Sequence, residues 1–161
     1  MGIVCNLIAD GLKKIEENKN RTNDVLIGKC DETFYVLLDG CACFSTQLEK
    51  WCYDTDKLLD AFHQNVPYDL SKMVKENEWF RVCYAGTMRK SDDKDVVLFQ
   101  YCNDYSDKMK VAMSPKYYKF IEKLTKAHPA LPMEIFVDGK DQMFKIELGG
   151  AVMAIVLGVR L

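Results

Sequence analysis

The sequence is 161 residues long, with 48% hydrophobic and 29% charged residues. A chain of this length and composition can bury a core of its own, without disulfides or metal ions to hold it together. Its formal net charge of -2 excludes a general attraction to nucleic acids or to anionic membranes. Any site for a polyanion must therefore be a local patch of basic residues.

Seven cysteines raise the question of a secreted disulfide scaffold. Residues 1–14 have no basic segment, and Asn6 and Asp10 interrupt their apolar run, so they do not resemble a signal peptide. An odd number of cysteines, most of them beside strand-like stretches, favours free thiols in a cytoplasmic protein. The longest apolar run, residues 149–159, is shorter than the ~18 residues that a membrane span needs.

The first part of the chain predicts a helix followed by three strands. Asn6 is a good helix N-cap, and apolar residues recur behind it at helical spacing: Leu7, Ile8, Leu12 and Ile15. Residues 25–30, 33–40 and 41–46 are rich in β-branched and aromatic side chains, which is typical of short strands. A helix with a polar interruption is expected next, over residues 47–63.

The middle of the chain predicts a short helix and then an antiparallel group of strands. The helix is expected over residues 68–76 and the strands over 79–89, 96–102 and 109–114. The charged residues 90–95 cannot be buried, so they mark the turn of a hairpin.

The C-terminal part contains the clearest helix start in the sequence. Ser114 is a good N-cap, and Pro115 stands at the first helical position, where its missing N–H costs nothing. The expected inward face of this helix consists of Tyr117, Phe120, Ile121 and Leu124. Strands are expected over residues 133–139, 143–149 and 151–161, which gives an α+β fold with mostly antiparallel sheets.

Two stretches of the sequence, 31–45 and 141–155, resemble each other. Aspartate, phenylalanine, leucine and glycine recur in the same places, as Asp31, Phe34, Leu38 and Gly40 and as Asp141, Phe144, Leu148 and Gly150. Each stretch follows an expected amphipathic helix and strand. We therefore expect one α+β domain over residues 1–161 with an internal repeat, in units of about 1–45 and 108–161 and a divergent third unit over 66–107.

The stretch "KMKVAMSPKYYKFIEKL", followed by "MEIFVDG" and the terminal "AVMAIVLGVRL", is similar to the end of bacterial DNA sliding clamps. "VPYDLSKMVK" and the two strands after it resemble the helix unit of archaeal and eukaryotic clamps. Gly158 stands where the family has a proline, and residues 45–66 form an insertion. The resemblance implies repeated β-α-β-β-β units, a role in DNA replication, and double-stranded DNA or a replication protein as partner. So short a chain would assemble a ring as a homo-oligomer.

Four lysines recur at helical spacing on the expected C-terminal helix: Lys116, Lys119, Lys123 and Lys126. In a clamp, such a face meets DNA phosphates without reading the base sequence. The alternative is the solvated side of an ordinary amphipathic helix.

The clamp resemblance also implies a peptide-binding role for the C-terminal tail. The residues that correspond by position to the tail of the clamp's pocket are Leu157, Val159, Arg160 and Leu161. The alternative is a final core strand with a frayed end.

No pattern in the sequence predicts catalysis, a metal or a cofactor. Cys41, Cys43, Cys52 and His63 lack the paired spacing of a zinc site, and neither His63 nor His128 completes a cysteine triad. Asp92, Asp93 and Asp95 lack the glycine and distal glutamate of a calcium loop, so we interpret them as turn residues. The sequence predicts a non-catalytic binding protein, either clamp-like or a small interaction or inhibitor protein of the immunity or phage accessory type.

Overall fold

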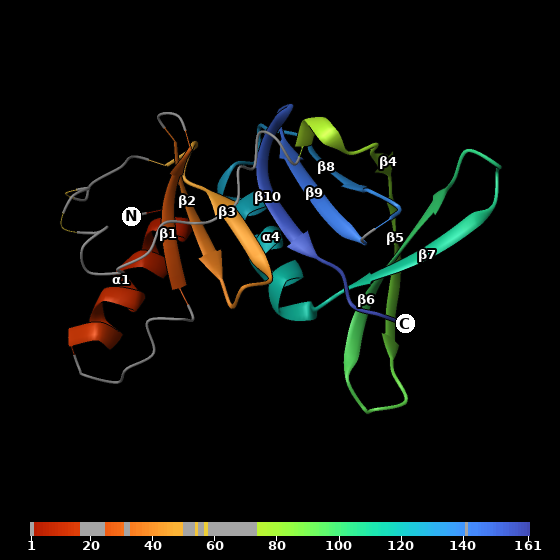
Figure 1. Cartoon of the computed structure of the whole chain (residues 1–161), viewed down its shortest axis with the longest axis horizontal. Helices are drawn as coiled ribbons and strands as arrows, with labels where there is room; N and C mark the ends of the chain where they lie inside the picture. Colours follow the sequence, from red (N-terminus) through yellow and green to blue (C-terminus); the bar gives the residue numbers. More distant parts are fainter. Residues whose placement is uncertain are drawn as a thin grey trace. The chain divides into compact units, whose positions relative to one another are not determined.

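A computed structural model describes the chain over residues 2–16, 25–30, 33–49, 54, 57, 74–140 and 142–161. The chain divides into two compact units, Met1–Val74 and Lys75–Leu161. Both units combine helix with antiparallel strands, so the predicted α+β class is confirmed (Figure 1). That the whole chain is one domain with a third repeat stays a prediction.

The first unit is one helix and a three-stranded antiparallel sheet. Helix α1 (Ile3–Glu16) is followed by β1 (Val25–Cys30), β2 (Thr33–Leu38) and β3 (Ala42–Ser45), which pair in chain order. All three strands were expected from the sequence. The fully buried side chains come from both layers, namely Val4, Cys5, Ile8, Ile27, Val36 and Phe44. Burying an aliphatic or aromatic side chain stabilises the fold by about 2 kcal/mol, so this layer holds α1 on the sheet.

Helix α1 begins earlier than the sequence predicts. It starts at Ile3, so Asn6 lies inside the helix and is not its N-cap. The carboxylate of Glu49 takes that role instead, accepting the N–H groups of Val4 (2.6 Å) and Cys5 (2.8 Å). A carboxylate satisfies the free N–H groups of a helix start and also matches its positive dipole end. The spacing of residues near the helix could not predict this cap, because Glu49 follows β3 and lies more than forty positions away in the sequence.

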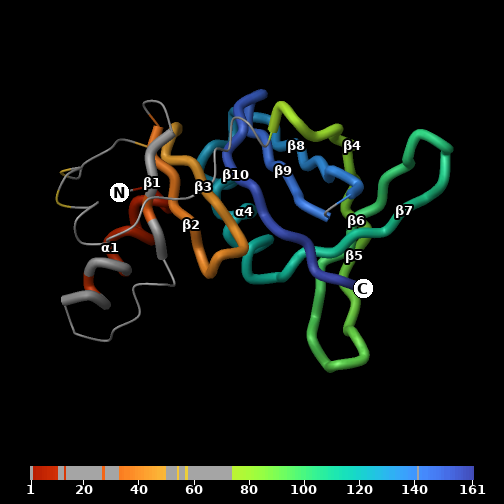
Figure 2. The backbone as a smooth tube through the Cα atoms, in the orientation of Figure 1, coloured from red at the N-terminus to blue at the C-terminus, as the bar shows by residue number. Residues whose placement is uncertain are grey.

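The second unit contains two sheets. The first has the order β10-β9-β8-β4, formed by β4 (Phe80–Arg81), β8 (Met133–Val137), β9 (Met143–Leu148) and β10 (Ala151–Leu157). The second is a meander of β5 (Cys83–Arg89), β6 (Asp95–Cys102) and β7 (Lys108–Met113). Its two hairpins extend in opposite directions (Figure 2).

The predicted strand over residues 79–89 is split between these two sheets. Phe80 pairs with Val137 in the first sheet, whereas Cys83 pairs with Gln100 in the second. Val82 stands at the break, buried, with its N–H bonded to the carbonyl of Ile135 (3.0 Å). A continuous apolar stretch contains no residue that marks a change from one sheet to another. The sequence therefore could not predict the split.

Helix α4 (Pro115–Ala127) begins where the sequence predicts. Pro115 follows Ser114, whose backbone is extended, although the Ser114 side chain makes no capping hydrogen bond. The helix buries Tyr117, Ile121 and Leu124, while Phe120 is only half-buried. The aromatic ring of Phe99 lies 5.3 Å from that of Phe144, so the core beside α4 joins the two sheets of this unit.

The hairpins β2–β3 and β9–β10 share a turn conformation but differ in register. Three residues separate the paired Leu38 and Ala42, whereas two separate Leu148 and Ala151. In the first, Asp39 and Gly40 have φ of 54° and 68°, and the N–H of Cys41 bonds to the carbonyl of Leu38 (3.0 Å). In the second, Gly149 and Gly150 have φ of 59° and 83°. Positive φ at both central residues is the type I′ turn, whose twist matches that of the strands. Each hairpin lies in the succession of a helix followed by three antiparallel strands.

Several sequence-based expectations fall outside the described residues. Most of the predicted helices over 47–63 and 68–76 do, although residues 74–76 are helical. The expected third unit, 66–107, is described only from residue 74, and Asp31 and Asp141 of the repeat are not described. In the part of the chain that is described, no helix is both long and apolar enough to cross a membrane.

Candidate functional site

The four predicted lysines all lie exposed on α4, opposite its buried residues. They are Lys116, Lys119, Lys123 and Lys126. Among the described residues, neither Lys119 nor Lys123 nor Lys126 forms an ion pair. The ammonium of Lys116 lies 5.8 Å from the ring centre of Tyr117. The helix carries Glu122 as its only acidic residue, so this lysine face is a local basic patch on an acidic protein.

An aromatic cluster fixes α4 on the sheet β5-β6-β7. The rings of Tyr84 and Tyr118 stack at 5.8 Å with 12° between their planes, and Phe99 meets both rings edge-on. Burial raises the pKa of the Tyr118 hydroxyl, with smaller contributions from Glu122 and Tyr84. This cluster limits rotation of the helix, so the lysine face keeps one orientation within the unit.

Helix α1 does not present a comparable face. Its exposed residues include Asn6, Asp10 and Lys13, which together carry no net charge. The basic patch in the described part of the chain's helices is therefore that of α4.

Of the four predicted peptide-binding residues, Leu157 ends the last strand and the other three lie beyond it. Strand β10 ends at Leu157, and the N–H of Gly158 then bonds to the carbonyl of Gln142 (2.7 Å). The N–H of Val159 bonds to the carbonyl of Ala112 on β7 (2.8 Å), so the tail crosses from one sheet of the unit to the other. Leu157 and Leu161 are 45% and 56% exposed. Gly158 and Val159 are thus held outside β10 by backbone hydrogen bonds.

A hollow of about 530 Å³ lies beside this tail. Its walls are formed by Lys140, Gln142, Gly158, Arg160 and Leu161. Two of the predicted peptide-binding residues, Arg160 and Leu161, line it, whereas Leu157 and Val159 do not. Lys140 and Gln142 were not predicted from the sequence, where their only signal is a polar stretch between two strands.

Strand β9 carries a buried cation that was not predicted from the sequence. Lys145 is 8% exposed, and its ammonium lies 3.6 Å from the carboxylate of Glu147. The same ammonium lies 4.5 Å from the ring centre of Phe136 and 5.0 Å from that of Trp79. A lysine so enclosed is held by an ion pair and by two cation–π contacts, which gives it a structural role.

Two of the residues weighed as metal ligands or catalysts, Cys43 and His128, occupy structural places. Burial raises the pKa of the Cys43 thiol to about 12, which keeps it protonated at neutral pH. Cys52 and His63 lie outside the described residues. The N–H of His128 closes the end of α4 on the carbonyl of Leu124 (3.2 Å). Among the residues that the structure describes, no three potential ligands gather.

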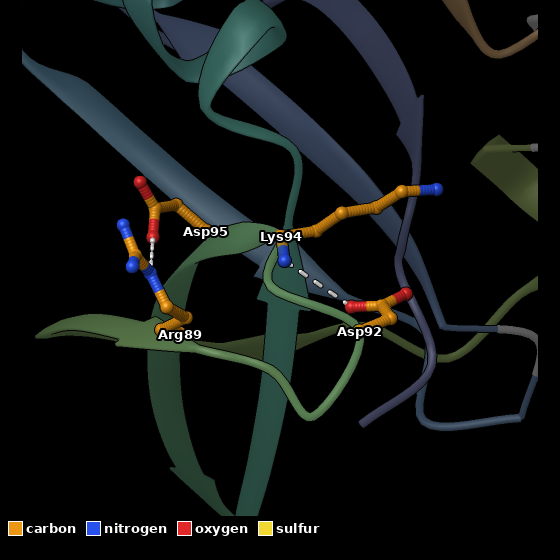
Figure 3. Close-up of polar contacts among 4 residues, drawn as sticks. All are labelled: Arg89, Asp92, Lys94 and Asp95. Carbon is orange, nitrogen blue, oxygen red and sulfur yellow. Dashed lines mark hydrogen bonds and ion pairs between the residues drawn. The ribbon is translucent and has the colours of Figure 1, made fainter.

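Asp92 and Asp93 lie in the β5–β6 turn, as the sequence predicts, whereas Asp95 is the first residue of β6. Figure 3 shows Asp95 paired with Arg89, its partner across the hairpin, at 3.3 Å. The carboxylate of Asp92 accepts the backbone N–H of Lys94 at 3.3 Å. Asp93 adopts φ of 61° at the turn itself. The carboxylates of Asp92 and Asp95 thus bond to residues of their own hairpin.

Comparison with known proteins gives no relative: no family model, no curated protein and no solved structure matches this chain.

Proposed function

We propose that this chain is a non-catalytic, clamp-like protein that binds the backbone of double-stranded DNA through the lysine face of α4. The observation that carries the proposal is the placement of Lys116, Lys119, Lys123 and Lys126 on one exposed side of a helix. Phosphates attract such a face regardless of base sequence, because each contact releases condensed counterions.

In each unit a helix is followed by three antiparallel strands, and this similarity supports the clamp-like part of the proposal. α1 precedes β1, β2 and β3, and α4 precedes β8, β9 and β10. Two of the aligned pairs on β2 and β9 are buried in both units, Val36 with Ile146 and Leu38 with Leu148, whereas Phe34 is half-buried and Phe144 fully buried. We infer that the chain arose from a duplicated unit of one helix and three strands, extended by β7 to a β-α-β-β-β order in the second unit.

A duplex-DNA titration tests the proposal. At about 50 mM salt, a fluorescence anisotropy titration should show wild-type binding that weakens steeply as salt is added. Changing all four lysines of α4 to Glu should abolish binding, and each single Lys→Ala change should reduce the salt slope by up to about 0.9. Sequence-scrambled duplexes should bind equally well, since phosphate contacts do not read bases.

A matched variant controls for charge alone. Lys75, Lys94, Lys108 and Lys110 are exposed residues outside α4, and changing these four to Glu alters the net charge equally. This control should retain most of the binding if the α4 face is the site. Equal loss in both variants, or no binding by the wild type, would contradict the proposal.

A protein partner is the second candidate, and the exposed apolar side chains of the second unit favour it. Tyr84 and Met88 on β5 are 58% and 39% exposed, and Leu157 and Leu161 lie exposed near the tail. Strand β5 also has an outer edge that no described strand pairs. An exposed strand edge can receive a strand of another protein. This candidate expects no duplex binding at any salt concentration.

A further inference from the structure

The hollow beside the tail has two walls, and hydrogen bonds hold both of them in place. One wall is the loop between β8 and β9, where the N–H of Met143 bonds to the Asp138 carboxylate (3.1 Å) and the N–H of Asp138 bonds to the Met143 carbonyl (3.1 Å). The Asp138 side chain is buried, so this closure is shielded from water. Lys140 belongs to this loop and lines the hollow.

The other wall is the tail, which is anchored at consecutive residues. Gly158 bonds to Gln142 on the opposite wall, and Val159 bonds to Ala112 on β7. A side chain at Gly158 would collide with the carbonyl of Gln142, so the close approach of the two walls depends on this glycine. Arg160 and Leu161 follow directly and line the hollow.

The hollow is lined by two cations, Lys140 on one wall and Arg160 on the other. Neither Lys140 nor Arg160 forms an ion pair among the described residues. Gln142, which also lines the hollow, adopts φ of 53°, a left-handed conformation that is strained for a residue with a side chain. Strained residues gather at ligand sites, where the surrounding structure holds them in place.

We propose that this hollow binds an oxyanion, the phosphate or carboxylate group of a small molecule, between Lys140 and Arg160. The guanidinium of Arg160 offers a planar pair of donors to such a group, and the ammonium of Lys140 supplies a second positive charge. A volume of about 530 Å³ lies within the usual range for small-molecule pockets. The site is independent of the DNA-binding proposal, because none of its residues belongs to α4.

Backbone amide NMR spectra of the full chain test this site directly. Inorganic phosphate and citrate serve as separate probes, with sodium chloride added to equal ionic strength as the control. We expect saturable shifts of the Gly158 and Gln142 amides with at least one probe and none with chloride. The probe that binds more tightly distinguishes phosphate from carboxylate recognition.

The variant Lys140→Gln/Arg160→Gln should reduce the affinity for the probe at least tenfold. The matched control is Lys108→Gln/Lys110→Gln, which removes two exposed lysines of β7 outside the hollow. It should bind as the wild type does. Unchanged affinity in the hollow variant, or shifts that chloride reproduces, would overturn the proposal. Failure of the α4 variants to alter DNA binding would leave this result untouched.

Discussion

Lys145 is a buried residue that forms both an ion pair and contacts with aromatic rings. Its ammonium lies over the rings of Phe136 and Trp79 and pairs with the carboxylate of Glu147. Glu147 in turn lies directly across the sheet from Glu134, and two carboxylates in that position repel each other. Arg81, 3.8 Å from Glu134, supplies the second cation of this row. The charges on this face of the sheet therefore stabilise one another only as a set.

Replacing Lys145 should destabilise the second unit. Lys145→Ala leaves Glu147 poorly compensated and removes the packing of the stem, so we expect a loss of roughly 3 kcal/mol in the free energy of unfolding. Lys145→Met keeps an unbranched apolar chain at this buried position and should cost less. Urea denaturation followed by circular dichroism measures both variants. Equal losses for Ala and Met would mean that the stem contributes nothing.

The elements of the fold follow local rules, and the two hairpins illustrate this. Each turn places two consecutive residues at positive φ, which glycine adopts without strain and asparagine tolerates. The sequence places Asp-Gly in one turn and Gly-Gly in the other. A Cβ on Gly40 or Gly150 would meet no atom within 4 Å, so space is not the constraint at either position. The backbone conformation alone requires these glycines.

Substitution of the two turn glycines should therefore have similar effects in both units. Gly40→Ala and Gly150→Ala should each cost about 1 kcal/mol, because alanine is strained at positive φ. Gly40→Asn and Gly150→Asn should cost less, because asparagine visits that region more readily. Thermal and urea unfolding give the comparison. If Asn were no better than Ala, the cost would come from side-chain contacts and not from backbone strain.

At the scale of the whole molecule, the distribution of charge bears on assembly. The lysine face lies on α4, whereas the exposed residues of α1 are mixed in charge. One basic helix covers only part of a DNA circumference. A clamp-like function of this chain therefore depends on several copies, each contributing its α4.

The mass of the protein in solution tests that dependence. A clamp-like assembly predicts an oligomer whose mass is a small integral multiple of the chain mass, as measured by light scattering or sedimentation equilibrium. In a closed ring every chain is held by two neighbours, so the mass should stay constant over a range of protein concentrations. A monomer at all concentrations would contradict the ring and favour the protein-partner candidate.

The sequence by itself determined the local structure of this protein. Stretches rich in β-branched and aromatic residues, separated by turn residues, located β1, β2, β3, β6, β7, β8 and β9, and Ser114 with Pro115 located the start of α4. The exposed position of the α4 lysines followed from helical spacing alone. These features depend on residues within a few positions of one another, whose preferences the sequence displays directly.

Only the tertiary structure decided which distant residues meet. It placed the Glu49 carboxylate at the start of α1, divided the predicted strand 79–89 at Val82 between two sheets, and buried Lys145 against Trp79. It also turned the tail away from β10, so that Arg160 faces the same hollow as Lys140. Such contacts carry no local signature, because each depends on how whole elements pack and on where loops return the chain.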